Sequence, residues 1–132
     1  PSLKEDSHQM EIVQKKALAQ SQALQTRLAQ EGVVELNNHG EGYFSKGWIF
    51  SGKYLFDYEK LFAFITALKI SRAKGVIITA QGSYAFNKAG SEFSCNKVPN
   101  SNDSRIELID TDESALNTIT SEQLLMLTKE AL

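Results

Sequence analysis

Cysteine is nearly absent from this chain, which has a single one, Cys95, among 132 residues. One cysteine excludes an internal disulfide and a metal cluster built on cysteines. No apolar run approaches the roughly 20 residues that a membrane-spanning helix needs. We therefore expect no membrane partner, and the cysteine usage fits the reducing cytoplasm.

Positive charge is also not in excess. The formal net charge is −2 at pH 7, and the chain contains no block of lysine and arginine. Nucleic-acid binding depends on a concentrated basic surface, so no nucleic-acid partner is expected. The length and the apolar fraction of 42% suit one globular domain with its own core.

A strand–helix–strand stretch in residues 40–79 contains most of the large apolar side chains. Phe44, Trp48 and Phe50 fall on one face of the first strand, because side chains alternate with period two. Asp57 is a good N-cap for the helix that follows. That helix presents one broad apolar side, made of Leu61, Phe62, Phe64, Ile65 and Leu68.

Residues 1–32 are predicted to form a helical linker or N-terminal helix that stops at Gly32. Its apolar stripe is thin and consists of Met10, Val13, Ala17, Leu24 and Leu28. Such a stripe needs a partner surface, either the sheet of this chain or another domain. The remaining residues, 33–132, are assigned to one folded domain.

Short turns divide the rest of the chain into strands. Turns are predicted at Asn37–Gly40, Gln81–Ser83 and Ala89–Ser91, each of which contains glycine and joins antiparallel neighbours. A further strand is predicted at Arg105–Ile109, followed by an exposed polar turn. A final helix begins after Thr120, where Gln123 completes a capping box, and directs Leu124, Leu127 and Leu132 to one side. The order of elements predicts an α+β fold, with a mainly antiparallel sheet of about five to six strands and helices packed on it.

The motifs of this core, taken together, resemble a known domain. They are Gly47–Phe50 in an aromatic strand, Asp57 at the start of a leucine-bearing helix, Arg72–Gly75 leading into a strand, and Asp103–Ile109. Their order is similar to the C-terminal domain of CobW-type P-loop GTPases, and the run Gly40–Ser51 looks closest to the YeiR-like branch of that family.

The resemblance implies a larger whole. Proteins of this class carry an N-terminal GTPase domain with a P-loop and a Cys-x-Cys-Cys motif, and they deliver metals, zinc among them, or assist cobalamin synthesis. This chain has neither a Gly-x-x-x-x-Gly-Lys-Ser/Thr motif nor Cys-x-Cys-Cys, and it begins at Pro1. We therefore expect a non-catalytic C-terminal domain without a cofactor of its own. GTP and a divalent metal such as zinc would belong to the rest of the protein.

Four residues are candidates for an interaction surface. Trp48 lies in the aromatic strand face, and an exposed Trp is typical of interface anchors, although core packing under the helix is the favoured interpretation. Arg72, Lys74 and Arg105 stand at strand entries, where they would contact the GTPase domain or an anionic ligand. The favoured alternative for these three is a set of structural ion pairs at the rim of the sheet.

Metal ligands and partners complete the expectations. His39, Glu41 and Cys95 would meet only by accident of folding, so no metal site is predicted in this chain. The expected partners are the chain's own GTPase domain, a second subunit or a client metalloprotein. The rival hypothesis is an independent α+β module for dimerisation or small-ligand binding, supported by the uncovered N-terminal helix.

Overall fold

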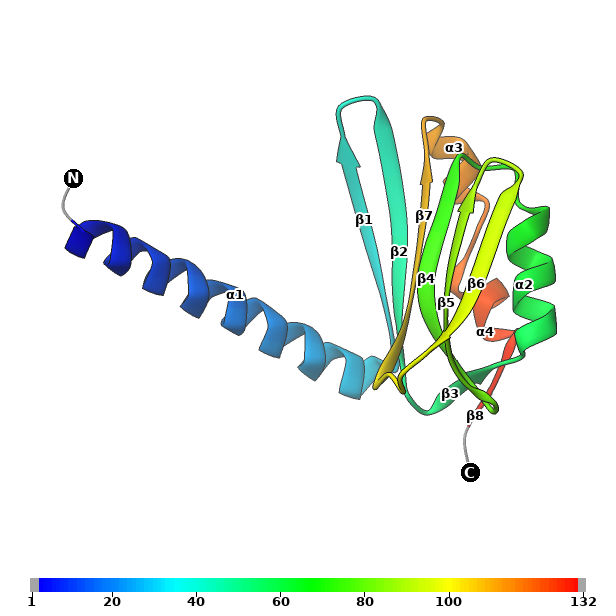
Figure 1. The fold of residues 1–132 in the computed structure, drawn as a ribbon, viewed down its shortest axis with the longest axis horizontal. Coiled ribbons are helices and arrows are strands. Elements are labelled where there is room, and N and C mark those ends of the chain that lie inside the picture. Colours follow the sequence, from blue (N-terminus) through cyan, green and yellow to red (C-terminus); the bar gives the residue numbers. More distant parts are fainter. Residues whose placement is uncertain (1–2, 131–132) are drawn as a thin grey trace.

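The computed structural model describes the backbone of residues 3–130 and the side chains of residues 9–130. Figure 1 shows a curled sheet with short helices on one side and one long helix projecting from its foot. In chain order the elements are α1 (Leu3–Glu31), β1 (Val33–Gly40), β2 (Tyr43–Ser51), β3 (Tyr54–Phe56), α2 (Tyr58–Ala67), β4 (Arg72–Thr79), β5 (Gly82–Ala89), β6 (Glu92–Val98), β7 (Asp103–Asp110), α3 (Glu113–Asn117), α4 (Ser121–Leu125) and β8 (Thr128–Glu130).

The sheet confirms the predicted α+β class. Within the described residues it has eight strands in the order β1-β2-β7-β4-β3-β8, and β5 and β6 continue from β4. Every pairing is antiparallel except that of β3 with β4, which are linked through α2. The two strands beyond the predicted set, β3 and β8, are three residues long and pair with each other.

The core lies between this sheet and the helices α2, α3 and α4. Trp48 and Phe50 from β2 and Leu61 and Ile65 from α2 are almost fully buried in it. Asp57 caps α2 as predicted, because its carboxylate accepts a hydrogen bond from the amide of Lys60. Among the described residues, no helix is both long and apolar enough to cross a bilayer.

Two buried polar side chains fasten the C-terminal helices to β2. Lys46 donates from Nζ to the carbonyl oxygen of Ile119 at 2.6 Å. Trp48 donates from Nε1 to Ser121 Oγ at 3.0 Å. The capping box of Thr120 and Gln123, predicted from the sequence, is present between these two attachment points. These contacts place α3 and α4 against the core side of the sheet.

Three local predictions were wrong. Asn37–Gly40 is not a turn but the second half of β1, and the hairpin turns at Glu41 and Gly42, where glycine supplies a φ of +79°. The segment after Asp110 contains the short helix α3, capped by Asp112. The final helix ends at Leu125 and the chain then forms β8. The predicted position of Leu132 lies outside the described residues.

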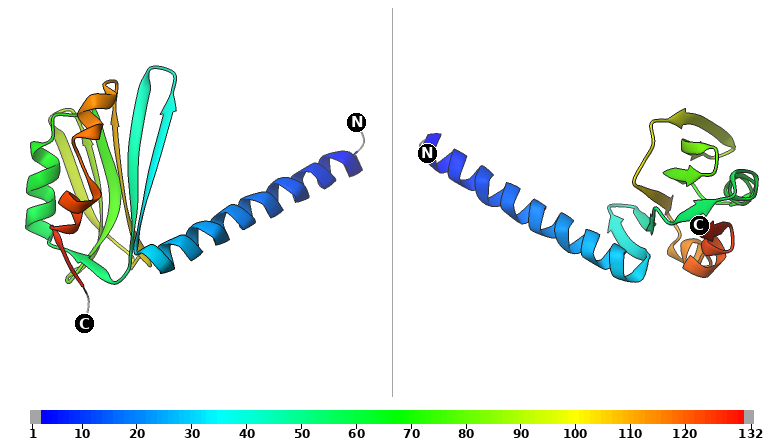
Figure 2. Two further views of the ribbon diagram at one scale, coloured as in Figure 1. Left: turned by 180° about the vertical axis from the view of Figure 1, so that it is seen from behind. Right: turned by 90° about the horizontal axis from the view of Figure 1, so that it is seen from below.

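The long helix α1 ends at Gly32, as predicted, with a φ of +79° that favours glycine. Leu24 and Leu28 in its last turns pack against Val34 and Ile49 on the side of the sheet opposite α2. From that contact the helix leaves the body on the β1 side of the sheet, as Figures 1 and 2 show. Only the end of α1 is therefore packed against the domain.

The junction between α2 and β4 is tied to the end of β7. Ser71 donates to Asp110 Oδ1 from its hydroxyl at 2.6 Å and from its amide at 3.1 Å. The hydroxyl hydrogen bond is the main reason why the pKa of Asp110 is held below its ordinary value. A carboxyl with a lowered pKa in the folded state stabilises the fold above its unfolded pKa, and this contribution is lost as the pH falls.

We expect the Ser71→Ala variant to be less stable than the wild-type chain at neutral pH, because the hydroxyl donor is lost. The difference should be constant near neutral pH and shrink as the pH falls below about 4, the ordinary range of the carboxyl. Urea denaturation of both chains at several pH values measures it. An equal difference at pH 3 and pH 7 would show that Asp110 does not mediate the effect.

Candidate functional site

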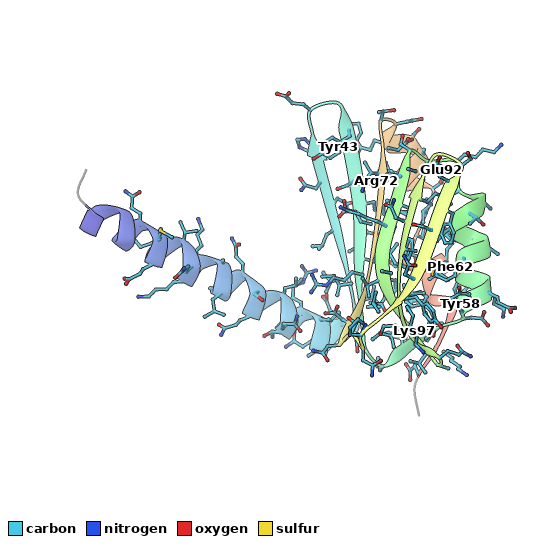
Figure 3. The ribbon with its side chains drawn as sticks, in the orientation of Figure 1. Tyr43, Tyr58, Phe62, Arg72, Glu92 and Lys97 are labelled. Atoms are coloured by element: carbon cyan, nitrogen blue, oxygen red, sulfur yellow. The ribbon has the colours of Figure 1, made fainter. Side chains whose placement is uncertain are left out.

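The side of the sheet opposite α2 carries most of the candidate interaction residues. In β4 the side chains of Ala73 and Ile77 are buried in the core, so those of Arg72, Lys74 and Val76 point to the other side. Figure 3 shows Arg72 on the side of the sheet away from α2. We call this side the open face, and its central residues are Val34, Leu36, Gly47, Ile49, Lys74, Val76, Arg105 and Glu107.

Strand register arranges these residues in two neighbouring rows. The first row crosses β1, β2, β7 and β4 in that order and consists of Leu36, Gly47, Glu107 and Lys74. The adjacent row consists of Val34, Ile49, Arg105 and Val76. The open face therefore combines apolar and charged side chains around one glycine.

A hollow of about 500 Å³ lies on the open face. Gly47 has no side chain between Leu36 and Glu107, and a Cβ atom built there would have only the carbonyl oxygens of Ile106 at 3.4 Å and Leu36 at 3.8 Å near it. The missing side chain thus deepens the middle of the face. The hollow is lined by Leu36, Asn38, Ser45, Gly47, Trp48, Ile49, Lys74, Gly75, Val76, Phe86, Arg105, Ile106 and Glu107.

The basic side chains at and near this hollow differ in how firmly neighbouring side chains bind them. Arg105 is fixed by Asp103, with its Nε atom 3.1 Å from Oδ1 of the carboxylate. Lys74 is exposed and lies opposite Glu107 in the ladder. Arg72 lies outside the hollow, and its Nε atom donates to Asn87 Oδ1 at 3.5 Å. Arg105 thus has the structural ion pair that one interpretation predicted, while Lys74 stays accessible to a partner.

Trp48 belongs to a different environment. Its side chain is only 1% exposed and packs in the core under α2. The residue borders the hollow, but the indole points to the opposite side and bonds Ser121. The structure therefore brings Lys74 and Arg105 together on the open face and places Arg72 one row away.

Sequence reasoning did not identify the residues that shape the hollow, namely Gly47, Leu36 and Glu107. One signal was present, because a glycine in the interior of a strand often marks a close approach by another group. The spatial neighbours of Gly47 come from β1 and β7, and their register with β2 is not written in any local pattern.

The three weighed metal ligands are not brought together. His39 lies near the end of β1 and Glu41 in the hairpin turn, whereas Cys95 lies in β6. Among the side chains of residues 9–130, no group of three or more His, Cys, Asp or Glu is arranged to hold a metal ion. The Cys95 thiol packs at the margin of the main core and accepts a hydrogen bond from the hydroxyl of Tyr58, 3.9 Å away, and this hydrogen bond raises the pKa of Tyr58.

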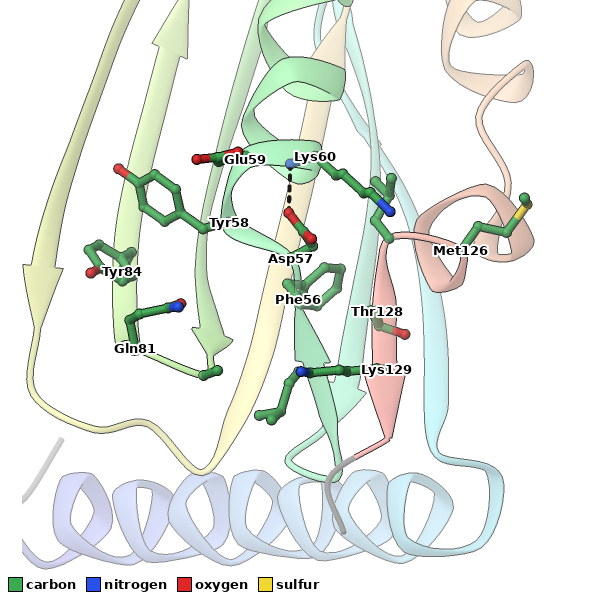
Figure 4. Close-up of a pocket in the computed structure, with 13 residues that line it drawn as sticks. Phe56, Asp57, Tyr58, Glu59, Lys60, Gln81, Tyr84, Met126, Thr128 and Lys129 are labelled. Carbon is green, nitrogen blue, oxygen red and sulfur yellow. Dashed lines mark hydrogen bonds between the residues drawn. The ribbon is translucent and has the colours of Figure 1, made fainter.

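A second hollow, of about 520 Å³, lies where α2 begins (Figure 4). The carboxylate of Asp57 accepts from the Lys60 amide there, so this free end of the helix already has an anionic partner. The charged residues that line this hollow are two lysines, Lys60 and Lys129, and two acidic residues, Asp57 and Glu59. The balanced charges give the hollow no preference for an ion of either sign.

The comparison with known proteins found a relative whose function is described. The zinc chaperone YeiR of Escherichia coli (strain K12) is 33% identical over 90 residues, which cover 66% of this chain and 27% of the relative. The chain thus spans about a quarter of the length of the curated relative that it matches. This similarity supports the CobW-like relationship that the motifs indicated. Neither a family model nor a solved structure matches the chain.

Proposed function

We propose that this chain is the C-terminal accessory domain of a CobW-like metal-chaperone GTPase and that it docks on the GTPase domain of the same protein. The open face is the docking surface, and the hollow at Gly47 is its centre. The observation that carries the proposal is this sheet face, of which α1 covers only the part at Val34 and Ile49, in a chain related to a zinc chaperone. The whole protein would act in the cytoplasm, with GTP and zinc bound by its other part.

The composition of the open face suits a partner protein. Leu36 and Val76 supply apolar surface, and Lys74 and Glu107 stand beside it. Protein interfaces commonly have an apolar centre and a polar rim. The hollow at Gly47 offers room for an anchoring side chain of the partner, which is where binding energy concentrates.

The GTPase domain is the occupant that best fits the comparison. The aligned segment is 27% of the zinc chaperone, so most of that protein lies outside it. A tethered partner is present at high effective concentration, and a surface of modest size then suffices for docking. An acidic group on the GTPase domain would complement Lys74, which has a free ammonium group on this face.

Docking gives the domain a role in the nucleotide cycle only if its strength differs between nucleotide states. A surface that binds both states equally shifts no equilibrium. Allosteric coupling of this kind typically changes affinity by roughly 5- to 150-fold. The mechanism proposed here is therefore a domain that favours either the GDP-bound or the GTP-bound form.

Calorimetric titration of this chain with the separately expressed GTPase portion tests the proposal, with GDP and with a non-hydrolysable GTP analogue. We expect affinity to depend on the nucleotide, and the Lys74→Glu variant to bind at least about tenfold more weakly, because the substitution reverses a charge at the hollow. Lys60→Glu is the matched control, since Lys60 is also exposed but belongs to α2 on the other side of the sheet.

Three outcomes would contradict the proposal. Absence of binding in both nucleotide states would exclude the GTPase domain as the partner. Equal losses in Lys74→Glu and Lys60→Glu would exclude the open face as the docking surface. GTP hydrolysis by the purified chain, in proportion to its concentration, would exclude a non-catalytic role.

A further inference from the structure

The free edge of β1 differs from the other edges of the sheet. Edge strands are usually protected by shortness, charge or proline, because their free backbone groups can pair with another strand. β8 is three residues long and includes Lys129 and Glu130, and β6 carries Glu92 and Lys97. β1 has eight residues, and its one charged side chain, Glu35, already lies 3.7 Å from Lys46 Nζ.

The backbone groups on this edge can be assigned by alternation. The amide of Ser51 donates to the carbonyl of Gly32 at 2.7 Å, just before the first paired residues of β1 and β2. In an antiparallel ladder every second residue bonds the partner strand, so Val33, Glu35 and Asn37 direct their backbone groups to the free side. His39 fits this pattern, because its amide bonds the side chain of Asn38.

Exposed apolar side chains are concentrated in α1 and in the β1–β2 hairpin. Within the described residues, six of the eight large hydrophobic side chains that are exposed belong to α1 and the β1–β2 hairpin. They are Met10, Ile12, Val13, Leu18, Leu36 and Tyr43. Both views of the fold show α1 leaving the body on the β1 side (Figures 1 and 2). The free edge and the uncovered helix therefore belong to one region.

The inner side of α1 continues an existing interface. Leu28 and Leu24 pack on the open face at the foot of the hairpin. Met10 precedes Leu28 by 18 residues, which is about five helical turns, and Val13 precedes Leu24 by 11 residues, about three turns. Met10 and Val13 thus lie on the same side of α1 as the two packed leucines, but both side chains are exposed.

We propose that this region binds a second copy of the chain, with β1 pairing antiparallel to the β1 of its partner. Several alignments of the two β1 strands would let their free backbone groups pair. We choose the one that places Leu36 opposite Leu36 of the partner subunit. Glu35 then lies opposite the partner's Asn37, which avoids facing two like charges. The helix α1 of each copy lies over the hairpin of the other, which covers Met10 and Val13. This dimer goes beyond the proposed docking and does not depend on it.

Multi-angle light scattering and analytical ultracentrifugation over a range of concentrations test the dimer. We expect the mass of two copies, falling toward one copy on dilution. Val13→Glu should raise the dissociation constant at least about tenfold, because it places a charge in an apolar contact. Ile12→Glu is the matched control: Ile12 is 51% exposed and Val13 is 65% exposed, but Ile12 lies on the opposite side of α1.

A cross-link tests the register. With Cys95→Ser as background, Leu36→Cys should give a disulfide-linked dimer when diamide oxidises the two thiols, since directly opposite residues are within the reach of a disulfide. Asn38→Cys is the control, because in this register Asn38 and its copy lie about 13 Å apart along the strands. Equal cross-linking of both variants would overturn the register.

A single-copy mass at every concentration up to several hundred micromolar would overturn the dimer itself. A dimer that Val13→Glu and Ile12→Glu weaken equally would overturn the role of α1. Lys74→Glu should leave the mass unchanged, because Lys74 lies on β4 at a distance from the edge. The dimer and the nucleotide-dependent docking can therefore fail separately.

Discussion

Replacing Gly75 with alanine is expected to lower the free energy of unfolding by about 3 kcal/mol or more. Gly75 lies in β4 on the core side, between Ala73 and Ile77. A Cβ atom there would lie 2.2 Å from the carbonyl oxygen of Arg105 and 2.9 Å from a ring carbon of Phe86. The carbonyl belongs to the paired strand β7 and cannot move without breaking the ladder. Urea denaturation followed by circular dichroism measures the loss.

Gly47→Ala is the matched control for this prediction. Gly47 also lies in the interior of a central strand, but on the open face, where a Cβ would come no closer than 3.4 Å to the nearest non-adjacent atom. The substitution should change the free energy of unfolding by about 1 kcal/mol or less. Alanine loses less backbone freedom than glycine when the strand forms, and this effect favours a small stabilisation. Equal losses in both variants would show that the two faces of the sheet are not packed differently.

The parts of the fold that could be predicted from the sequence have local causes. Asp57 and Thr120 are caps with their partners within one helical turn, so their hydrogen bonds follow from spacing alone. Gly90 adopts a positive φ in the turn where it was expected, and Gly82, also with a positive φ, begins β5 directly after the turn at Ala80 and Gln81. Alternation in β4 likewise placed Arg72 and Lys74 on one face with Val76. Each of these inferences needed only neighbouring residues.

The errors arose where the pairing of strands decides the local conformation. Asn37–Gly40 has the composition of a turn, yet its residues are extended because they pair in register with Tyr43–Lys46. β8 depends on β3, and neither three-residue strand has enough residues to show a period. Pairing with another strand outweighs local preference in both cases.

The open face illustrates the same division. The sequence indicated that Lys74 and Arg105 are basic residues at strand entries, and alternation gave the side of the sheet for Lys74. It could not show that both border one hollow, because that depends on β7 lying between β2 and β4. Gly47 became visible as the centre of the hollow only with its neighbours Leu36 and Glu107 in place.

Trp48→Ala is expected to lower the free energy of unfolding by about 3–5 kcal/mol, the usual cost of removing a large buried aromatic side chain. Its indole is buried in the main core and donates to Ser121 Oγ at 3.0 Å. The Nζ atom of Lys46 also lies 5.4 Å from the centre of the ring. The substitution therefore removes apolar packing together with one attachment of α4 to the sheet.

The hydrogen bond can be separated from the packing with smaller changes. Trp48→Phe keeps an aromatic ring but loses the Nε1 donor, and Ser121→Ala loses the acceptor. In a double-mutant cycle the two changes should be coupled by about 1 kcal/mol, as for a hydrogen bond between neutral groups. A chain that tolerated Trp48→Ala without loss of stability but bound the GTPase portion less well would assign Trp48 to recognition. Because the indole is buried on the side away from the open face, we expect the opposite result, a loss of stability. Trp48 would then support the proposed docking surface only from behind.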